Sequence, residues 1–182
     1  LASFLALVTG STLIIASACV LNNYFDRDID KIMKRTKKRA LAAGSIPGRN
    51  AVAFGILLGV LGLGTLILYT NSLVVILGLV GFIDYLVIYA MIGKRKAMHG
   101  TLLGSISGAI PILAGYVAVT GTIDAGAVIV FLILFFWQMP EFYAIAIYRH
   151  DEYKAAGVPV ISVVKGIKET KKHIFIYTVL FV

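Results

Sequence analysis

The sequence has few of the residues that build soluble, disulfide-linked or secreted domains. Its 182 residues include one cysteine and four prolines, and only 14% of its side chains are charged. The single cysteine, Cys19, lies in an apolar run, which excludes a disulfide within the chain and favours a packing role. No basic segment or cleavage pattern accompanies the first apolar run, so a signal peptide is not expected.

Long apolar runs dominate what is present. The chain is 59% hydrophobic with a mean hydropathy of +0.93, which is too apolar for an ordinary soluble domain. Runs of this length predict an all-α, polytopic membrane helical bundle. The expected spans are residues 1–24, 51–70, 73–92, 101–120 and 125–148, with a sixth that starts near residue 174. Because apolar runs reach both ends, we expect residues 1–182 to be a single membrane-embedded domain that lacks the first and last helices of a longer protein.

Positive charges occur only on alternate connections. All 17 Lys and Arg residues lie within 26–50, 93–100 and 149–172, and the other two connections contain none. Six alternating spans would place these three connections on one side of the membrane, and the positive-inside rule makes that side cytoplasmic. The net charge of +8 is then explained by topology and by contact with anionic lipids of the bilayer, without a nucleic acid partner.

The segment that begins at Asn22 carries three acids in five residues, where an apolar run meets a basic loop. Asn22, Asp26 and Asp30 are four residues apart, so in a continuous helix they share one face. Carboxylates at this spacing repel each other, which favours a cation between them. An EF-hand calcium loop is excluded, because Lys31 and Lys37 occupy the positions that require Gly and Glu.

A dense basic run accompanies these oxygen ligands. Its members are Arg27, Lys31, Lys34, Arg35, Lys37, Lys38 and Arg39. Magnesium binds through few carboxylates and completes its shell with waters and substrate phosphates, while Arg and Lys bind phosphate oxygens. We therefore expect Asn22, Asp26 and Asp30 to hold Mg²⁺ together with a polyanion such as diphosphate. The alternative is a solvated charge cluster that ends a helix.

A second polar group surrounds the end of the 125–148 run. Glu141 is ionisable within an apolar span, where such residues are functional candidates. The residues that follow at the expected membrane surface are Tyr148, Arg149, Asp151 and Glu152. Lys94, at the end of the third span, is a further candidate for phosphate contact. The alternative is a snorkelling Glu141 beside a surface acid pair, and Asp84 has no assigned role.

Taken together, these segments resemble a known family. Asn22 to Asp30, followed by Arg35-Thr36-Lys37-Lys38-Arg39, is similar to the first Asp-rich motif of the haem-farnesylating branch of the UbiA superfamily of intramembrane prenyltransferases. Residues 101–116 resemble its Gly/Pro helix, and residues 137–166 resemble its second signature. The resemblance covers essentially the whole chain. Glu141 stands where the family usually has His, and Ala40 where it commonly has Pro.

The resemblance implies a nine-helix bundle around a capped cavity on the cytoplasmic side, of which this chain covers about six helices. It implies transfer of a farnesyl group from farnesyl diphosphate to a vinyl group of haem B, with Mg²⁺ as cofactor. It also implies a bacterial inner membrane, or the mitochondrial inner membrane in a eukaryote, and association with haem A synthase or terminal oxidase assembly. The metal role of the motif carries over to Asn22, Asp26 and Asp30.

The candidate residues fall into two groups. Catalytic roles are expected for Asn22, Asp26, Asp30, Tyr148 and Asp151, and substrate contacts for Arg27, Arg35, Lys38, Lys94, Arg149 and Glu141. One alternative function is a related enzyme that prenylates an aromatic ring. Another is an ion transporter whose acids line a path, which the clustering of acids and cations at one membrane face disfavours.

Overall fold

The computed structural model describes all residues from 1 to 182, and its regular secondary structure is entirely helical. The long elements are α1 (Ala2–Phe25), α3 (Gly48–Tyr69), α4 (Ser72–Ile83), the π-helix η1 (Asp84–Gly93), α6 (Gly100–Thr120), α7 (Ala125–Tyr148) and α10 (Gly166–Phe181). The short helices of the connections are α2 (Arg27–Ile32), α5 (Lys94–Lys96), α8 (His150–Ala155) and α9 (Ile161–Val164). The predicted all-α membrane bundle is confirmed.

Five segments are long and apolar enough to cross a membrane. They are α1, α3, the continuous segment Ser72–Lys96, α6 and α7, and they match the first five predicted spans to within a few residues. The apolar run predicted from near residue 174 lies within α10, which begins at Gly166 and is not among these five segments. Its first half is polar, and an ion pair of 2.8 Å between Lys172 and Glu169, one helical turn apart, supports that polar turn.

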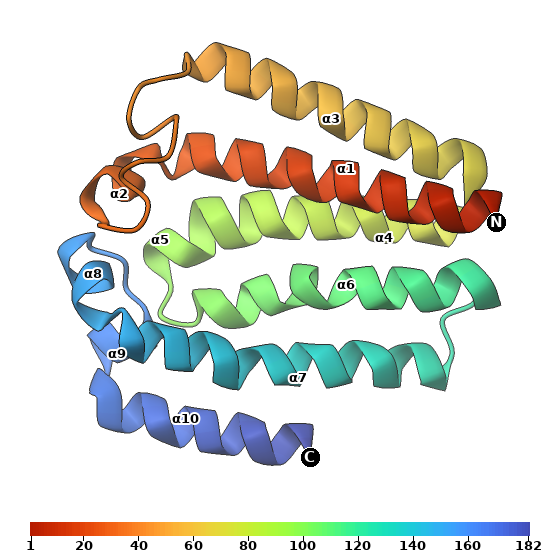
Figure 1. The fold of residues 1–182 in the computed structure, drawn as a ribbon. Coiled ribbons are helices and arrows are strands. Elements are labelled where there is room, and N and C mark those ends of the chain that lie inside the picture. Colours follow the sequence, from red (N-terminus) through yellow and green to blue (C-terminus); the bar gives the residue numbers. More distant parts are fainter.

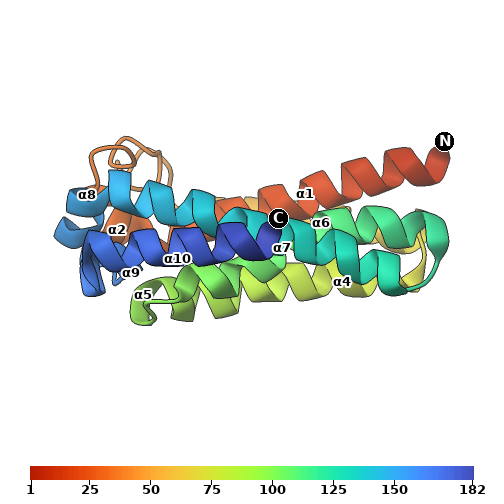
Figure 2. The same ribbon diagram turned by 90° about the horizontal axis from the view of Figure 1, so that it is seen from below.

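The three basic connections lie at one end of the bundle. Figure 1 shows α2, α5, α8 and α9 together at that end, while the α3–α4 and α6–α7 connections lie at the other. Figure 2, turned by 90°, shows the same separation along the bundle axis. The alternation of charge in the sequence therefore corresponds to a physical gathering of cations at one end of the helices.

Helices α1 and α3 approach each other closely through glycines. A Cβ atom built on Gly62 would lie 2.8 Å from the carbonyl oxygen of Gly10 and 2.9 Å from the backbone nitrogen of Ile14. Backbone atoms cannot yield as a side chain can, so the contact requires glycine. Ser17 adds a hydrogen bond of 2.6 Å from its hydroxyl to the Gly55 carbonyl. Small residues and interhelical hydrogen bonds are the usual means of packing membrane helices.

Substituting Gly62 by alanine is expected to destabilise the bundle by about 1–3 kcal/mol, because the added methyl group forces α1 and α3 apart. Thermal melting of the purified protein in detergent measures the effect. Gly64→Ala is the matched control, because a Cβ there meets nothing within 4 Å. Equal melting temperatures for the two variants would contradict the assigned contact.

The third span changes its helical geometry midway. Residues Asp84–Gly93 form a π-helix, a rare form that is found frequently at functional sites. At its start Asp84 is buried, and its Oδ2 accepts a hydrogen bond of 3.0 Å from the backbone N–H of Ser107 on α6. At its end a Cβ on Gly100 would lie 2.6 Å from the Gly93 carbonyl oxygen. The π-helix is thus fixed to α6 at both ends, and it carries Lys94 toward the basic end of the bundle.

Candidate functional site

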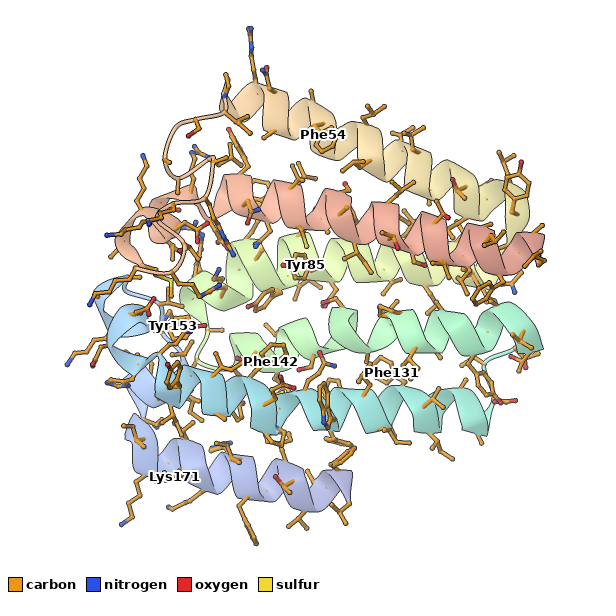
Figure 3. The ribbon with its side chains drawn as sticks, in the orientation of Figure 1. Phe54, Tyr85, Phe131, Phe142, Tyr153 and Lys171 are labelled. Carbon is orange, nitrogen blue, oxygen red and sulfur yellow. The ribbon has the colours of Figure 1, made fainter.

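A cavity of about 470 Å³ runs along the inside of the bundle between α1, α4 with η1, α6 and α7. Its apolar part is lined by residues that include Ile14, Leu66, Val74, Ile110 and Ala114. Its polar lining includes Asn22, Asp30, Arg35, Arg39 and Lys94, which belong to the basic end. Figure 3 labels three of the aromatic lining residues, with Tyr85 and Phe142 on helices that flank α6 and Tyr153 at the basic end. The cavity therefore joins a charged mouth to an apolar interior.

The Asp-rich motif crosses the junction between α1 and α2. α1 ends at Phe25, Asp26 has φ −86° and ψ 1°, and α2 begins at Arg27. The four-residue hydrogen bonds nevertheless continue, from Asp26 N–H to the Asn22 carbonyl and from Asp30 N–H to the Asp26 carbonyl, both at 2.8 Å. The predicted shared face therefore survives the break, and all three motif side chains are buried.

Two oxygens of the motif are buried without a hydrogen-bond donor, namely Asn22 Oδ1 and Asp26 Oδ1. A buried acceptor without a partner costs free energy, so this arrangement favours a bound cation. Carboxylate and amide oxygens are the ligands that magnesium takes in proteins. No group of three His, Cys, Asp or Glu side chains lies close enough to hold a metal alone. The residues thus fit a Mg²⁺ that also takes waters and substrate oxygens as ligands.

Two cations, one from α5 and one from the connection after α2, pair with the acids of the motif. Lys94 forms an ion pair with Asp26 Oδ2, and the Lys94 side chain is only 17% exposed. Arg39 Nη1 donates to Asp30 Oδ2 and to Asn23 Oδ1, each over 3.0 Å. Both cations also line the cavity, so they lie where a bound phosphate would meet them. The basic run thus folds back over the motif that precedes it.

Asp28 does not line this cavity. Its carboxylate receives two hydrogen bonds from Arg95, of 2.7 and 2.9 Å. That guanidinium holds the pKa of the Asp28 carboxyl well below its usual range. Although three acids lie close together in the sequence, only Asp26 and Asp30 remain for the metal-binding face.

Several predicted residues lie outside the cavity lining. Arg27 stacks on the Tyr24 ring with 4.2 Å between Cζ and the ring centroid, and it donates to the Tyr24 carbonyl. Tyr148 is 82% exposed. Lys38, Glu141 and Asp151 are exposed and have no ion pair. Arg35, by contrast, lines the cavity, as Asn22 and Lys94 do.

The segment that carries the second acidic group packs against the segment of the first. Ile29 and Met33 pack against Val158, and Tyr153 packs on this cluster. Burial raises the pKa of Tyr153 above its ordinary value, and Arg35 is close enough to act against that rise. The two polar segments that the sequence placed at one membrane surface are therefore in contact.

Within this group Glu152 is better placed than Asp151. Glu152 Oε1 accepts a hydrogen bond of 3.0 Å from Arg149, and its Oε2 is buried without a partner. Asp151 is exposed. The sequence contained both acids but gave no means of choosing between these neighbours, because the choice depends on which face of α8 packs inward.

Three lining residues were also not selected as site residues from the sequence, namely Arg39, Tyr85 and Tyr89. Their positions on the basic run and on the third span were visible.

The two acids give a matched test. Glu152→Gln is expected to weaken Mg²⁺-dependent binding of inorganic diphosphate about tenfold, the size of effect typical of a residue that orients metal-site ligands. Asp151→Asn should cost clearly less, because its carboxylate is solvated. Titration of both purified variants with inorganic diphosphate in the presence of Mg²⁺ measures the difference. A larger loss for Asp151→Asn would show that the exposed acid is the functional one.

Comparisons with known proteins agree on one family. The model of the UbiA prenyltransferase family matches residues 1–182. A protoheme IX farnesyltransferase of Yersinia pseudotuberculosis is 48% identical over 178 residues, which cover 98% of this chain and 60% of that protein. Its counterpart from Photorhabdus laumondii is 47% identical with the same coverage. The chain thus spans about three fifths of the length of the curated relatives that it matches.

A solved structure has the same fold. It is a UbiA homolog from Archaeoglobus fulgidus bound to DMAPP and Mg²⁺, with a TM-score of 0.77 and 17% sequence identity. The match covers 100% of this chain and 64% of that chain. At this level of identity the likeness establishes the architecture of the bundle, and the ligands named are those of the homolog.

Proposed function

Because this chain belongs to the UbiA prenyltransferase family, we propose that it transfers a farnesyl group from farnesyl diphosphate to a vinyl group of haem B. The acceptor is supported by the name of the curated relatives, protoheme IX farnesyltransferase. Residues 1–182 would form one membrane-embedded prenyltransferase domain, with the basic connections cytoplasmic. In a bacterium the membrane is the inner membrane, where haem A synthase and terminal oxidase assembly are the expected partners.

One observation carries this proposal. Asn22 Oδ1 and Asp26 Oδ1 are buried without hydrogen-bond donors, and both Asn22 and Lys94, the ion-pair partner of Asp26, line the charged mouth of an apolar cavity. A prenyl diphosphate likewise combines a polyanionic head, which would suit the charged mouth, with a long apolar tail, which would suit the apolar interior. The head requires a metal and cationic donors, and the tail requires a water-poor cavity. The adjacency of the two features supports an amphiphilic diphosphate as the substrate.

Bound Mg²⁺ would supply Lewis-acid neutralisation of the departing diphosphate. Asn22, Asp26 and Asp30 would hold it, directly or through waters. Lys94 and Arg35 would donate to phosphate oxygens, because they line the same mouth, and Arg39 could join them when its contact with Asp30 is exchanged. These donors oppose the negative charge that grows on the leaving oxygen.

The reaction then proceeds in the apolar part of the site. The bond between farnesyl C1 and the diphosphate oxygen breaks, and both electrons leave with the diphosphate. The vinyl group of haem forms the new carbon–carbon bond, and the resulting cation takes up water and loses a proton to give the hydroxyethylfarnesyl group. Tyr85 and Tyr89 line the cavity and present aromatic rings that stabilise nearby positive charge. The apolar walls limit early capture of the cation by water.

The remaining candidates are proposed for supporting roles. Arg149, held by Glu152, and the neighbouring Asp151 and Tyr148 would contribute from the mouth if substrate binding moves α8 inward. Arg27 and Lys38 would attract the polyanion to the charged end before it binds. Glu141, an exposed carboxylate on α7 next to the lining residue Phe142, is proposed to contact haem and not the diphosphate.

The direct test incubates the purified protein with haem B, farnesyl diphosphate and Mg²⁺ and detects haem O by mass spectrometry. We expect the product to appear with farnesyl diphosphate and to require the divalent ion. Parallel reactions offer aromatic acceptors, such as hydroxybenzoate, in place of haem. Prenylation of the aromatic compound with no haem product would replace this proposal by an aromatic prenyltransferase.

A further inference from the structure

Arg95 bridges α5 to the junction between α1 and α2. Its Nη1 donates to Asp28 Oδ2 over 2.9 Å, and its Nη2 donates to Asp28 Oδ1 over 2.7 Å. Nη2 also donates to the backbone carbonyl of Phe25 over 2.6 Å. One side chain therefore grips the last residue of α1 and the second residue of α2, although it comes from a helix almost 70 residues further along the chain.

The α1–α2 junction requires a hydrogen-bond donor from outside the two helices. Helix α1 ends at Phe25, and carbonyls at a helix C-terminus lack intrahelical donors. Asp26 departs from helical geometry and yet stays fully buried, and its Oδ1 has no hydrogen-bond donor. The direction of that oxygen depends on the backbone turn at Asp26. A donor fixed to the Phe25 carbonyl on one side and to Asp28 on the other determines this turn.

Arg95 also separates the acids. Its Nη2 lies 3.9 Å from Asp26 Oδ1, and its fork holds Asp28, whose side chain is 64% exposed, away from the buried pair. Without the fork, Asp28 would be free to turn toward Asp26 or to fray α2. Lys94, the preceding residue, contacts Asp26 from the cavity side. The two consecutive cations thus have different contacts. Lys94 lines the mouth of the cavity, and Arg95 binds the backbone of the α1–α2 junction.

We propose that Arg95 is a positioning residue that holds the α1–α2 junction in the shape that keeps Asn22, Asp26 and Asp30 on one face for the metal–diphosphate. This inference rests on the proposed function. It assigns Arg95 an indirect role, through backbone geometry, that differs from the direct phosphate contact proposed for Lys94.

The test measures Mg²⁺-dependent binding of farnesyl thiodiphosphate, an unreactive analogue, by calorimetric titration of the purified protein. Arg95→Gln is expected to weaken binding on the order of tenfold, as loss of a partner behind a metal site does. Arg95→Lys should not restore it, because an ammonium cannot span two carboxylate oxygens and a carbonyl. Lys96→Gln, an exposed neighbour without an ion pair, is the matched control and should bind as the unmodified protein does.

A double substitution tests whether Arg95 acts through the geometry of the junction or only by neutralising the charge of Asp28. Asp28→Asn alone should weaken binding less than threefold, because the bond from Arg95 to the Phe25 carbonyl remains. Arg95→Gln combined with Asp28→Asn should stay as weak as Arg95→Gln. Full recovery in the double variant would overturn the proposal, since Arg95 would then only neutralise Asp28. Normal binding by Arg95→Lys would overturn it as well, and that variant decides the question if Arg95→Gln does not fold.

The titration distinguishes this proposal from the proposed function. If the unmodified protein binds the thiodiphosphate with Mg²⁺ but makes no haem O, the acceptor is wrong, while the Arg95 series still reports on the junction. If the unmodified protein shows no Mg²⁺-dependent binding, both proposals fail together. If haem O forms and the Arg95 variants bind normally, only the positioning role fails.

Discussion

Replacing Asp26 by asparagine is expected to lower farnesyl transfer at least ~100-fold while the protein remains folded. The substitution keeps the size of the side chain but removes the charge that would hold Mg²⁺ beside Asn22. It also leaves Lys94, which is largely buried, without its ion-pair partner. The loss should appear mainly in kcat, because neutralisation of the diphosphate matters most as the C–O bond breaks. Single-turnover assays with saturating farnesyl diphosphate and haem measure it.

Two controls make this result specific. Glu169→Gln removes a carboxylate from an exposed ion pair with Lys172 on α10, and it should leave turnover within about twofold, since exposed pairs contribute little. Thermal melting of Asp26→Asn must show a folded protein, because an unpaired Lys94 is itself destabilising. Near-normal turnover by a folded Asp26→Asn variant would contradict the metal role of the motif.

Substituting Gly108 by leucine is expected to lower transfer on the order of 100-fold by filling the cavity. Gly108 lines the cavity on α6, and a Cβ there would lie 1.9 Å from the Gln138 side-chain oxygen. The Gln138 amide would have to move, and its hydrogen bonds to the carbonyls of Leu134 and Ser105 would be disturbed. Because the mouth residues are untouched, the loss should appear as weaker binding of the prenyl chain or haem.

The matched control for this variant lies seven residues further along the same helix. Gly115 does not line the cavity, and a Cβ at that position meets nothing within 4 Å, so Gly115→Leu should retain most of the activity. Inorganic diphosphate serves as a second probe, because it uses the mouth but not the apolar interior. Weakened diphosphate binding in Gly108→Leu would show that the substitution disturbs the mouth and not the cavity alone.

The sequence was sufficient for the spans because hydropathy and length decide them. Residues 125–148, for example, form α7 with the predicted bounds. Hydropathy located only the apolar part of α10, because it marks apolar stretches, whereas the helix extends through a polar turn from Gly166. The π-helix that begins at Asp84 could not be predicted either, because its residues are as apolar as those of the α-helical spans.

The candidate site was predictable where local spacing sets the geometry. Asn22, Asp26 and Asp30 share a face because four-residue spacing survives the junction at Asp26. The pairing of acids with cations distant in the sequence was not predictable. Only the folded chain shows that Lys94 meets Asp26 while its neighbour Arg95 meets Asp28, since both are cations at the end of one span.

Because residues Asp84–Gly93 form a π-helix, the number of residues in the third span determines how Lys94 and Arg95 are oriented toward the acids. In a π-helix each turn contains more residues than in an α-helix, so removal of one residue would let the segment relax to ordinary α geometry. The span would still cross the bilayer, but Lys94 and Arg95 would rotate away from the acids that they bind. Relatives that keep both cations should therefore tolerate substitutions within this segment far better than single-residue insertions or deletions.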